Sequence, residues 1–291
     1  MKLNMKIFDR MRKLLILAAV IVASFAGVAA SAQTTAHPQD EGYNFIQNIS
    51  YVSADEDDTY RLERCKLDVY YPDTDKGFAT LVWYHGGGLE GGNKELIEGF
   101  RRQGFAVVSV NYRLFPQGKC PDYIEDAAQA LAWTFENIEK YGGDPEHIYV
   151  SGHSAGGYLA LMMVLAKEFT QKYGLDADRI AKAYPISGQT VTHYTIRKER
   201  GLPEGIPVID EFAPITHAGR GGAPMVLITG DRDLEMLARW EENVHLQALL
   251  KNFNHDSVLY ELDGFNHVTV LAPAVTWIAN DIRTMWYLAN K

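Results

Sequence analysis

The stretch from Ile148 to Ala166 constrains the fold of this chain more than any other. Ile148 to Val150 is a short apolar run that predicts a strand, and Tyr158 to Ala166 predicts an apolar helix. Between them, the pattern Gly-x-Ser-x-Gly places Ser154 on a tight strand-to-helix turn that exposes its hydroxyl. The first amides of the helix favour negative charge at the same place. The stretch predicts a candidate nucleophile, although a glycine-rich turn with an incidental serine fits the same residues.

Apolar runs alternate with helical patterns along the rest of the chain. Residues 80–84 form a continuous run of the kind expected of a strand that is buried on both faces. Residues 106–110 predict the next buried strand, and residues 225–229 predict a further strand. The other expected elements are strands over 45–52, 61–71 (an edge strand ending at Pro72), 180–186 and 257–262, and helices over 94–103, 122–141, 234–252 and 272–290. The alternation predicts an α/β fold with a mostly parallel central sheet and helices on both faces.

The first 32 residues have the composition of a leader. Five basic side chains up to Lys13 precede an apolar run over 14–25, and Ala30-Ser31-Ala32 is a cleavage site of small residues. We expect a signal peptide over 1–32, one domain over 33–291, and export to a periplasm or the extracellular space. Without the leader, the formal charge of −9 becomes −13, which argues against nucleic acid or an anionic membrane as a partner.

The sequence predicts neither a metal nor a cofactor. It contains no His-Glu-x-x-His and no cluster of cysteines and histidines at ligand spacing, and no Gly-x-Gly-x-x-Gly opens the first expected helix. Cys65 and Cys120 could form a disulfide in an exported protein. Alternatively, Cys65 packs in the core on the same strand face as Leu67 and Val69.

A serine needs a base and a carboxylate to become a nucleophile. In parallel sheets the ligand site lies beyond the carboxyl ends of the strands, so residues that directly follow a strand are the candidates. His267 follows the last expected strand and is the candidate base. Asp231 and Asp233 both follow the strand over 225–229. We choose Asp233 as the acid because it lies further into the loop, and Asp231 stays open.

The glycine run His85-Gly86-Gly87-Gly88 follows the buried strand over 80–84. Its amides can fold over the nucleophile and, with the amide of Ala155, stabilise the oxyanion of a tetrahedral intermediate. We therefore expect an oxyanion hole made by Gly87, Gly88 and Ala155, with His85 as a brace for the loop.

These motifs together resemble the alpha/beta-hydrolase superfamily in its esterase/lipase branch, from about residue 61 to the C-terminus. The chain order serine, acid, histidine is the order of that superfamily. Two further stretches agree with the branch, Asp126-Ala127 and Gly142-Gly143-Asp144-Pro145. The chain is similar to exported feruloyl and acetyl-xylan esterases and, more distantly, to kynurenine formamidases. It departs from the common pattern after the glycine run, where Leu89 and Glu90 stand in place of an aromatic residue.

The resemblance implies a serine carboxylesterase that acts through an acyl-enzyme on acetyl or feruloyl esters, including those of plant polysaccharide. Three other functions remain open: an amide hydrolase of the formamidase or peptidase type, a lipase, and a non-catalytic binding protein on the same scaffold. The long connection over 188–222 can cap the site, with Gln189, His193 and Tyr194 as candidates to touch the leaving group.

Overall fold

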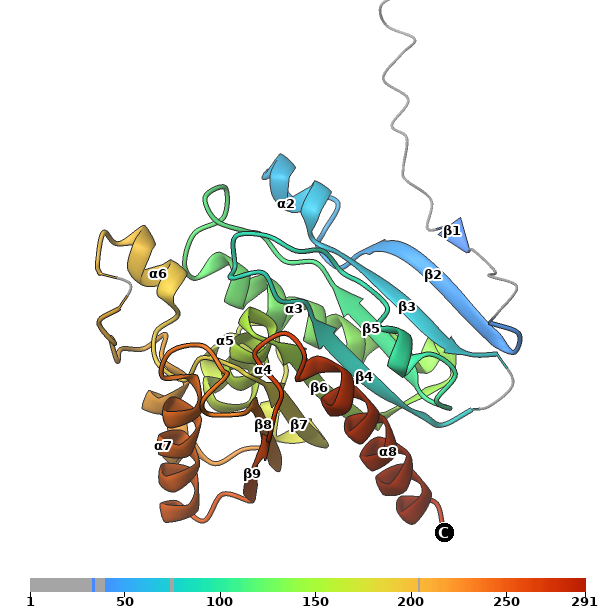
Figure 1. The fold of residues 1–291 in the computed structure, drawn as a ribbon. Helices are drawn as coiled ribbons and strands as arrows, with labels where there is room; N and C mark the ends of the chain where they lie inside the picture. The colour runs from blue at the N-terminus through green and yellow to red at the C-terminus, as the bar shows by residue number, and fades with distance from the viewer. Residues whose placement is uncertain (1–32, 35–39, 74–75, 204) are drawn as a thin grey trace, which may run out of the picture. The chain divides into compact units, whose positions relative to one another are not determined.

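The computed structural model describes residues 33–34, 40–73, 76–203 and 205–291. The described residues form one sheet with the strand order β1-β2-β3-β5-β4-β6-β7-β8-β9 (Figure 1). The strands are β1 (Gln33–Thr34), β2 (Tyr43–Ser50), β3 (Lys66–Pro72), β4 (Phe78–Tyr84), β5 (Ala106–Val110), β6 (Gly143–His153), β7 (Lys182–Ile186), β8 (Met225–Gly230) and β9 (Ser257–Leu262). The signal peptide expected over residues 1–32 lies outside the described residues.

The sheet is parallel from β5 across β4, β6, β7 and β8 to β9, whereas β1, β2 and β3 pair antiparallel. Every residue of β4, β5 and β8 is buried, which explains why their sequences are apolar at nearly every position. Tyr84 of β4 pairs with Gly152 of β6, and His153 pairs with Ile186 of β7. The segments that follow these three central strands therefore leave the sheet side by side.

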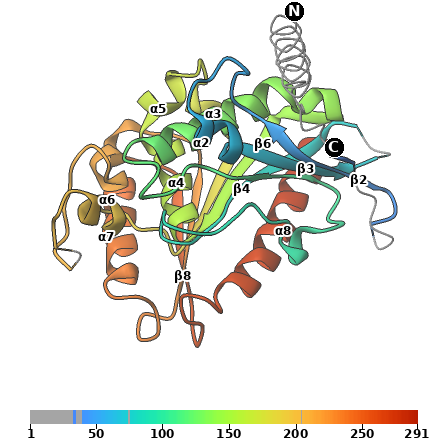
Figure 2. The ribbon, with the colours of Figure 1, turned by 90° about the horizontal axis from the view of Figure 1, so that it is seen from above.

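Helices cover both faces of the sheet, as Figures 1 and 2 show. The described helices are α2 (Thr59–Arg64), α3 (Asp122–Asn137), α4 (Ala155–Leu165), α5 (Lys167–Gln171), α6 (Tyr194–Glu199), α7 (Arg239–Asn252) and α8 (Leu271–Ala289), with 3-10 turns η1 (Glu98–Phe100), η2 (Ile138–Tyr141), η3 (Ala177–Arg179) and η4 (Pro214–Arg220). Side chains of α3, α4 and α7 share one apolar cluster, whereas α8 and η1 pack in a second. The arrangement confirms the predicted α/β fold.

Three expected elements are wrong in extent. The helix expected over 94–103 is only the short turn η1, because the amides of Lys94 and Glu95 donate to the side chains of Asn111 and Ser109. The first part of the strand expected over 61–71 is the helix α2, whose N-terminal amides are capped by Asp58. In addition, β3 lies inside the sheet and is not an edge strand.

The third element that differs in extent is the helix expected over 234–252, and this difference affects the site. The helix expected from Leu234 begins at Arg239, which leaves residues 231–238 as a loop on the carboxyl rim of the sheet. The cysteines are both free thiols, Cys65 buried and Cys120 partly buried. Burial raises the pKa of the Cys120 thiol to about 12.

Candidate active site

Ser154 lies at the junction of β6 and α4, as the sequence predicts. Its φ of 57° is in the left-handed region that side-chain-bearing residues rarely adopt. The turn requires glycine on both sides, because a Cβ on Gly156 would lie 1.9 Å from the carbonyl oxygen of Tyr84. A Cβ on Gly152 would likewise lie 2.5 Å from the backbone of Gly156. The local packing thus fixes the strained serine and presents its hydroxyl at the rim of the sheet.

His267 reaches this hydroxyl from the loop after β9. Its Nε2 lies 2.9 Å from Oγ of Ser154. The backbone carbonyl of His267 accepts a hydrogen bond of 2.7 Å from Nε2 of His153, the residue that precedes the serine. The structure therefore brings the predicted nucleophile and the predicted base together and anchors the histidine loop to the end of β6.

The carboxylate beside His267 is Glu235, which corrects the choice of Asp233. Oε1 of Glu235 accepts a short hydrogen bond from Nδ1 of His267. Asp233 is exposed, and its backbone amide donates to Oδ1 of Asp231. Asp231 in turn accepts from the amide of Gly264 and so links the loops after β8 and β9. Neither aspartate bonds to His267.

The turn after β8 explains this placement. The amides of Leu234 and Glu235 both donate to the carbonyl of Asp231, at 2.9 and 2.8 Å, so the chain folds back on itself. The fold-back points Asp233 to solvent and returns Glu235 to the sheet. A prediction that admits glutamate as the acid, as this superfamily does, could find Glu235. The sequence predicts a helix from Leu234, which puts Glu235 inside that helix and not among the residues that directly follow the strand.

The surroundings of Glu235 keep it ionised. Its side chain is buried, which raises the pKa of a carboxyl. Hydrogen bonds from His267, the Ser187 hydroxyl (2.6 Å) and the Met236 amide (2.9 Å) outweigh burial and lower the pKa of Glu235 to about 2. A carboxylate held in this state fixes the proton of His267 on Nδ1, and Nε2 is then free to accept the proton of Ser154.

The glycine loop lies next to the nucleophile at Gly86, where an added Cβ would lie 3.6 Å from Cβ of Ser154. Gly87 and Gly88 have φ values of 109° and 66°, which favour glycine. Their carbonyls are occupied, since Gly87 accepts from the amides of Glu90 and Gly91 and Gly88 accepts from the Thr195 hydroxyl. Within the described ranges, the amides of Gly87, Gly88 and Ala155 donate to no other group of the chain. They are available to an oxyanion.

His85 braces this loop through Arg64. The guanidinium of Arg64 lies 3.1 Å from Nε2 of His85 and donates to the carbonyl of Gly92 (2.8 Å) and to Oδ1 of Asn93 (2.5 Å). Nδ1 of His85 donates to the Gly86 carbonyl at 2.6 Å. Burial, with Arg64 adding to it, lowers the pKa of His85 to about 4, so the ring stays neutral and structural.

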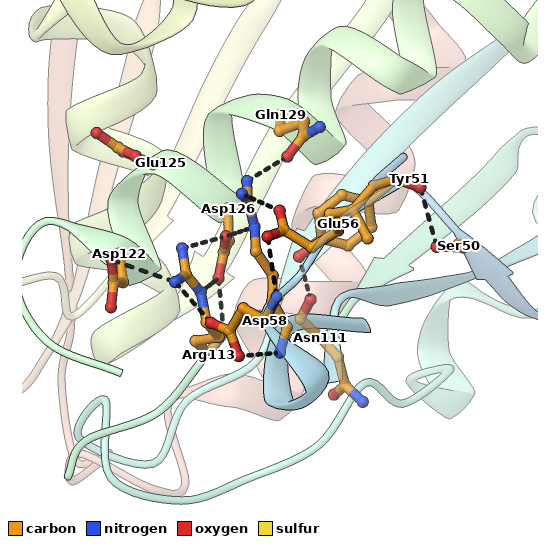
Figure 3. Close-up of polar contacts among 12 residues, drawn as sticks. Ser50, Tyr51, Glu56, Asp58, Asn111, Arg113, Asp122, Glu125, Asp126 and Gln129 are labelled. Carbon is orange, nitrogen blue, oxygen red and sulfur yellow. Dashed lines mark hydrogen bonds and ion pairs between the residues drawn. The ribbon is translucent and has the colours of Figure 1, made fainter. Parts of the chain in front are cut away.

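A buried ion pair holds the segment that contacts the glycine loop. Arg113, just after β5, donates from Nε and Nη2 to both carboxylate oxygens of Asp126 on α3, at 2.7 and 2.9 Å (Figure 3). Arg61 of α2 reaches the same carboxylate at 3.2 Å. Two residues after Arg113, the amide of Phe115 donates to the carbonyl of Leu89, which directly follows the glycine run. Asp126 thereby fixes the segment against which the glycine loop rests.

Two cavities are lined by sequence neighbours of the site residues. One of about 550 Å³ is lined by residues of the 188–222 connection, of the loop before α7 and of α7 itself, among them Gln189, Tyr194, Met236 and Arg239. Tyr194 closes it toward the glycine loop, since its hydroxyl lies 2.0 Å from where a Cβ on Gly88 would be. Of the three residues expected to touch a leaving group, Gln189 and Tyr194 line this cavity. His193 is instead buried against Tyr158.

The second cavity, of about 420 Å³, is lined by His85, Gly86, Gly87, His153 and residues 92–95. A larger groove of about 850 Å³ lies elsewhere, between the end of α8 and the start of β4, and contains no residue of the site. Among the described residues, no group of three or more acidic, histidine or cysteine side chains could hold a metal ion. No helix in the described ranges combines the length and the apolar composition that a membrane crossing requires.

The described residues have the alpha/beta-hydrolase fold, with a serine, a histidine and a carboxylate on the carboxyl rim of the sheet. Residues 67–196 match the family model BD-FAE. The chain is 38% identical over 175 residues to a probable isoprenylcysteine alpha-carbonyl methylesterase of Oryza sativa subsp. japonica, a match that covers 52% of this chain and 40% of the relative. It is 28% identical over 194 residues to a probable carboxylic ester hydrolase of Mycobacterium tuberculosis, covering 57% and 44%.

Solved structures agree with the fold. A truncated carbohydrate esterase from gut microbiota superposes with a TM-score of 0.69 at 16% identity, over 88% of this chain and all of the other. An esterase from the archaeon Pyrobaculum calidifontis superposes with a TM-score of 0.59 at 26% identity, over 76% and 81%. The chain spans less than half the length of the two curated relatives above. The curated relatives and solved structures that resemble the chain include several esterases.

Proposed function

We propose that the protein is a serine carboxylesterase that works through an acyl-enzyme on Ser154. The observation that carries the proposal is the continuous chain of contacts from Ser154 Oγ through the His267 ring to the Glu235 carboxylate. The unpaired amides of Gly87, Gly88 and Ala155 add donors where an oxyanion would form. The ester hydrolases among the relatives support the same reaction class.

The reaction follows from this geometry. Nε2 of His267 takes the hydroxyl proton of Ser154 as Oγ attacks the ester carbonyl carbon, and the carbonyl oxygen becomes an oxyanion held by the loop amides. The C–O bond to the alcohol then breaks, and His267 returns the proton to the departing alcohol oxygen. A water molecule, deprotonated by His267, attacks the acyl-enzyme, and the released Ser154 oxygen recovers a proton from His267. Glu235 stabilises the imidazolium of His267 during both acylation and deacylation.

We assign the acyl group to the cavity beside Tyr194. Its wall carries apolar side chains, among them Val191, Pro207, Ile209 and Met236, which suit a short-chain or aromatic acyl group. Acetyl and feruloyl groups on plant polysaccharide are the substrates that the family resemblance suggests. The leader-like sequence of residues 1–32 supports the further proposal that the enzyme is exported to such substrates.

A substrate panel tests the proposal. Nitrophenyl esters of short and long acyl chains, acetylated xylan, methyl ferulate and formylkynurenine are each offered to the wild type and to Ser154→Ala. The proposal predicts hydrolysis of short or aromatic esters and loss of on the order of 10⁴-fold in the variant. Preference for formylkynurenine would replace the ester assignment by an amide one, and equal activity of the variant would refute the mechanism.

A further inference from the structure

The ring of His153 is held in one protonation state beside the nucleophile. A carbonyl can only accept, so the 2.7 Å contact with the backbone oxygen of His267 places a proton on Nε2 of His153. Burial and the neighbouring His267 lower the pKa of His153 to about 4 and keep the ring neutral near neutral pH. The other nitrogen, Nδ1, therefore carries a free lone pair and is a hydrogen-bond acceptor.

This acceptor faces a space that Ser154 shares. A Cβ placed on Gly86 would lie 3.4 Å from Nδ1 of His153 and 3.6 Å from Cβ of Ser154, so the absence of a side chain on Gly86 leaves space next to both residues. His153 lines the cavity of about 420 Å³ described above. Within the described ranges, no donor of the chain bonds to this nitrogen.

The position of the ring indicates which half of an ester it meets. His267 must protonate the departing alcohol oxygen, so the alcohol lies on the His267 side of Ser154. The rings of His153 and His267 are 4.8 Å apart between centroids. The cavity is also polar at its outer end, where Asn93, Lys94 and Glu95 line it. Oδ1 of Asn93 is occupied by Arg64, and Lys94 is paired with Asp68.

From these contacts, and on the basis of the proposed esterase function, we propose that the cavity binds the alcohol half of the substrate and that His153 Nδ1 accepts a hydrogen bond from a hydroxyl next to the ester. The substrate class is an acyl ester of a polyhydroxylated alcohol, such as a glycerol or glycosyl unit. A simple alkyl or methyl ester covers this acceptor without giving it a hydrogen-bond partner, which opposes binding of that ester in the transition state.

A matched pair of esters tests this inference. 2-Hydroxyethyl butyrate and propyl butyrate have the same acyl group and nearly the same size, and they differ in one hydroxyl. The wild type is expected to hydrolyse the hydroxyethyl ester with a kcat/KM on the order of 10-fold higher. Because both esters meet the same enzyme, the ratio of the two values is independent of the fraction of active protein.

Two variants separate specificity from positioning. His153→Gln places an amide donor near the Nε2 position, so it can keep the contact with the His267 carbonyl while it removes the acceptor at Nδ1. The ratio is expected to fall toward 1. His153→Asn places an oxygen near the Nδ1 position and loses the contact with His267. This variant is expected to keep the ratio while kcat falls for both esters.

The outcomes are distinct. A wild-type ratio near 1, or a wild-type ratio retained in His153→Gln, overturns the inference and leaves the esterase proposal intact. Hydrolysis of neither ester, with no labelling of Ser154 by a fluorophosphonate, overturns both. A ratio that is lost in the glutamine variant and kept in the asparagine variant supports the inference, because a role limited to anchoring His267 would not change the preference for a hydroxyl.

Discussion

Replacement of Glu235 by glutamine is the most informative single change in the site. The surroundings lower the pKa of Glu235 from 4.5 to about 2, which corresponds to on the order of 3 kcal/mol in favour of the carboxylate. The largest favourable part of this free energy comes from the hydrogen bond with His267, and the carboxylate stabilises the imidazolium form of that residue. Loss of that stabilisation alone predicts about 100-fold slower acylation. A glutamine amide can also donate to Nδ1, which moves the ring proton to Nε2 and raises the expected loss in kcat to 10³–10⁴-fold.

The assay measures kcat and KM for a short nitrophenyl ester near pH 7.5, with thermal unfolding of each variant as a check on folding. Asp233→Asn is the matched control, since Asp233 is an exposed carboxylate two residues away that does not bond to His267. It is expected to stay within about 3-fold of the wild type. A folded Glu235→Gln variant with more than a tenth of wild-type kcat would refute the reasoning, as would an equal loss in Asp233→Asn.

Three further predictions follow from the same contacts. Gly88→Ala should lower kcat/KM by on the order of 100-fold, because the new Cβ would meet the Tyr194 hydroxyl at 2.0 Å; adding Tyr194→Phe should restore part of it in the ester assay, and a double variant no better than the single one would exclude this clash. Asp126→Asn removes the carboxylate that accepts from Nε and Nη2 of Arg113 and leaves the guanidinium only the contacts of Nη1 with Asp58 and Asp122, so it should lower the free energy of unfolding in urea by about 3 kcal/mol. The cap variant Asp176→Ala, at η3 and outside this network, should cost about 1 kcal/mol; similar losses would show that the ion pair is not the support we describe. The pKa of His85 is lowered from 6.5 to about 4, so the unfolded chain binds a proton that the native chain lacks as pH falls between these values. The contribution of His85 to the free energy of unfolding should therefore be fully present well above pH 6.5, and about 2–3 kcal/mol of it should be lost near pH 4.5. Urea titrations should find the total loss smaller by this amount in His85→Gln, and an unchanged pH dependence in that variant would contradict the assignment.

The sequence predicts those parts of the fold that depend on burial and on tight turns. Strands buried on both faces are apolar at nearly every position, with one small hydroxyl residue in each of β4, β5 and β8, so these strands could be located closely from composition. The glycines around Ser154 are required by backbone contacts shorter than a side chain allows, and the pattern is visible for that reason. His267 could be selected because it directly follows the last strand.

The parts that could not be predicted depend on contacts between distant segments. Residues 94–103 have a helical pattern, but the Asn111 and Ser109 side chains hold their first amides in a loop. Leu234 to Leu237 also fit a helix. In the structure, the amides of Leu234 and Glu235 instead close a turn on the Asp231 carbonyl, and α7 begins only at Arg239. This turn brings the Glu235 carboxylate to His267. Which carboxylate reaches His267 is set by the position of this turn, and the local sequence does not determine that position.

The central claim is that Ser154 is the nucleophile of an acyl-enzyme. Mass spectrometry of the intact protein after treatment with a fluorophosphonate tests it most directly. The account predicts one adduct per chain, mapped to Ser154 after proteolysis, which is absent in Ser154→Ala and forms far more slowly in Glu235→Gln. An unlabelled wild-type protein, or an adduct on another residue that survives in Ser154→Ala, would contradict it.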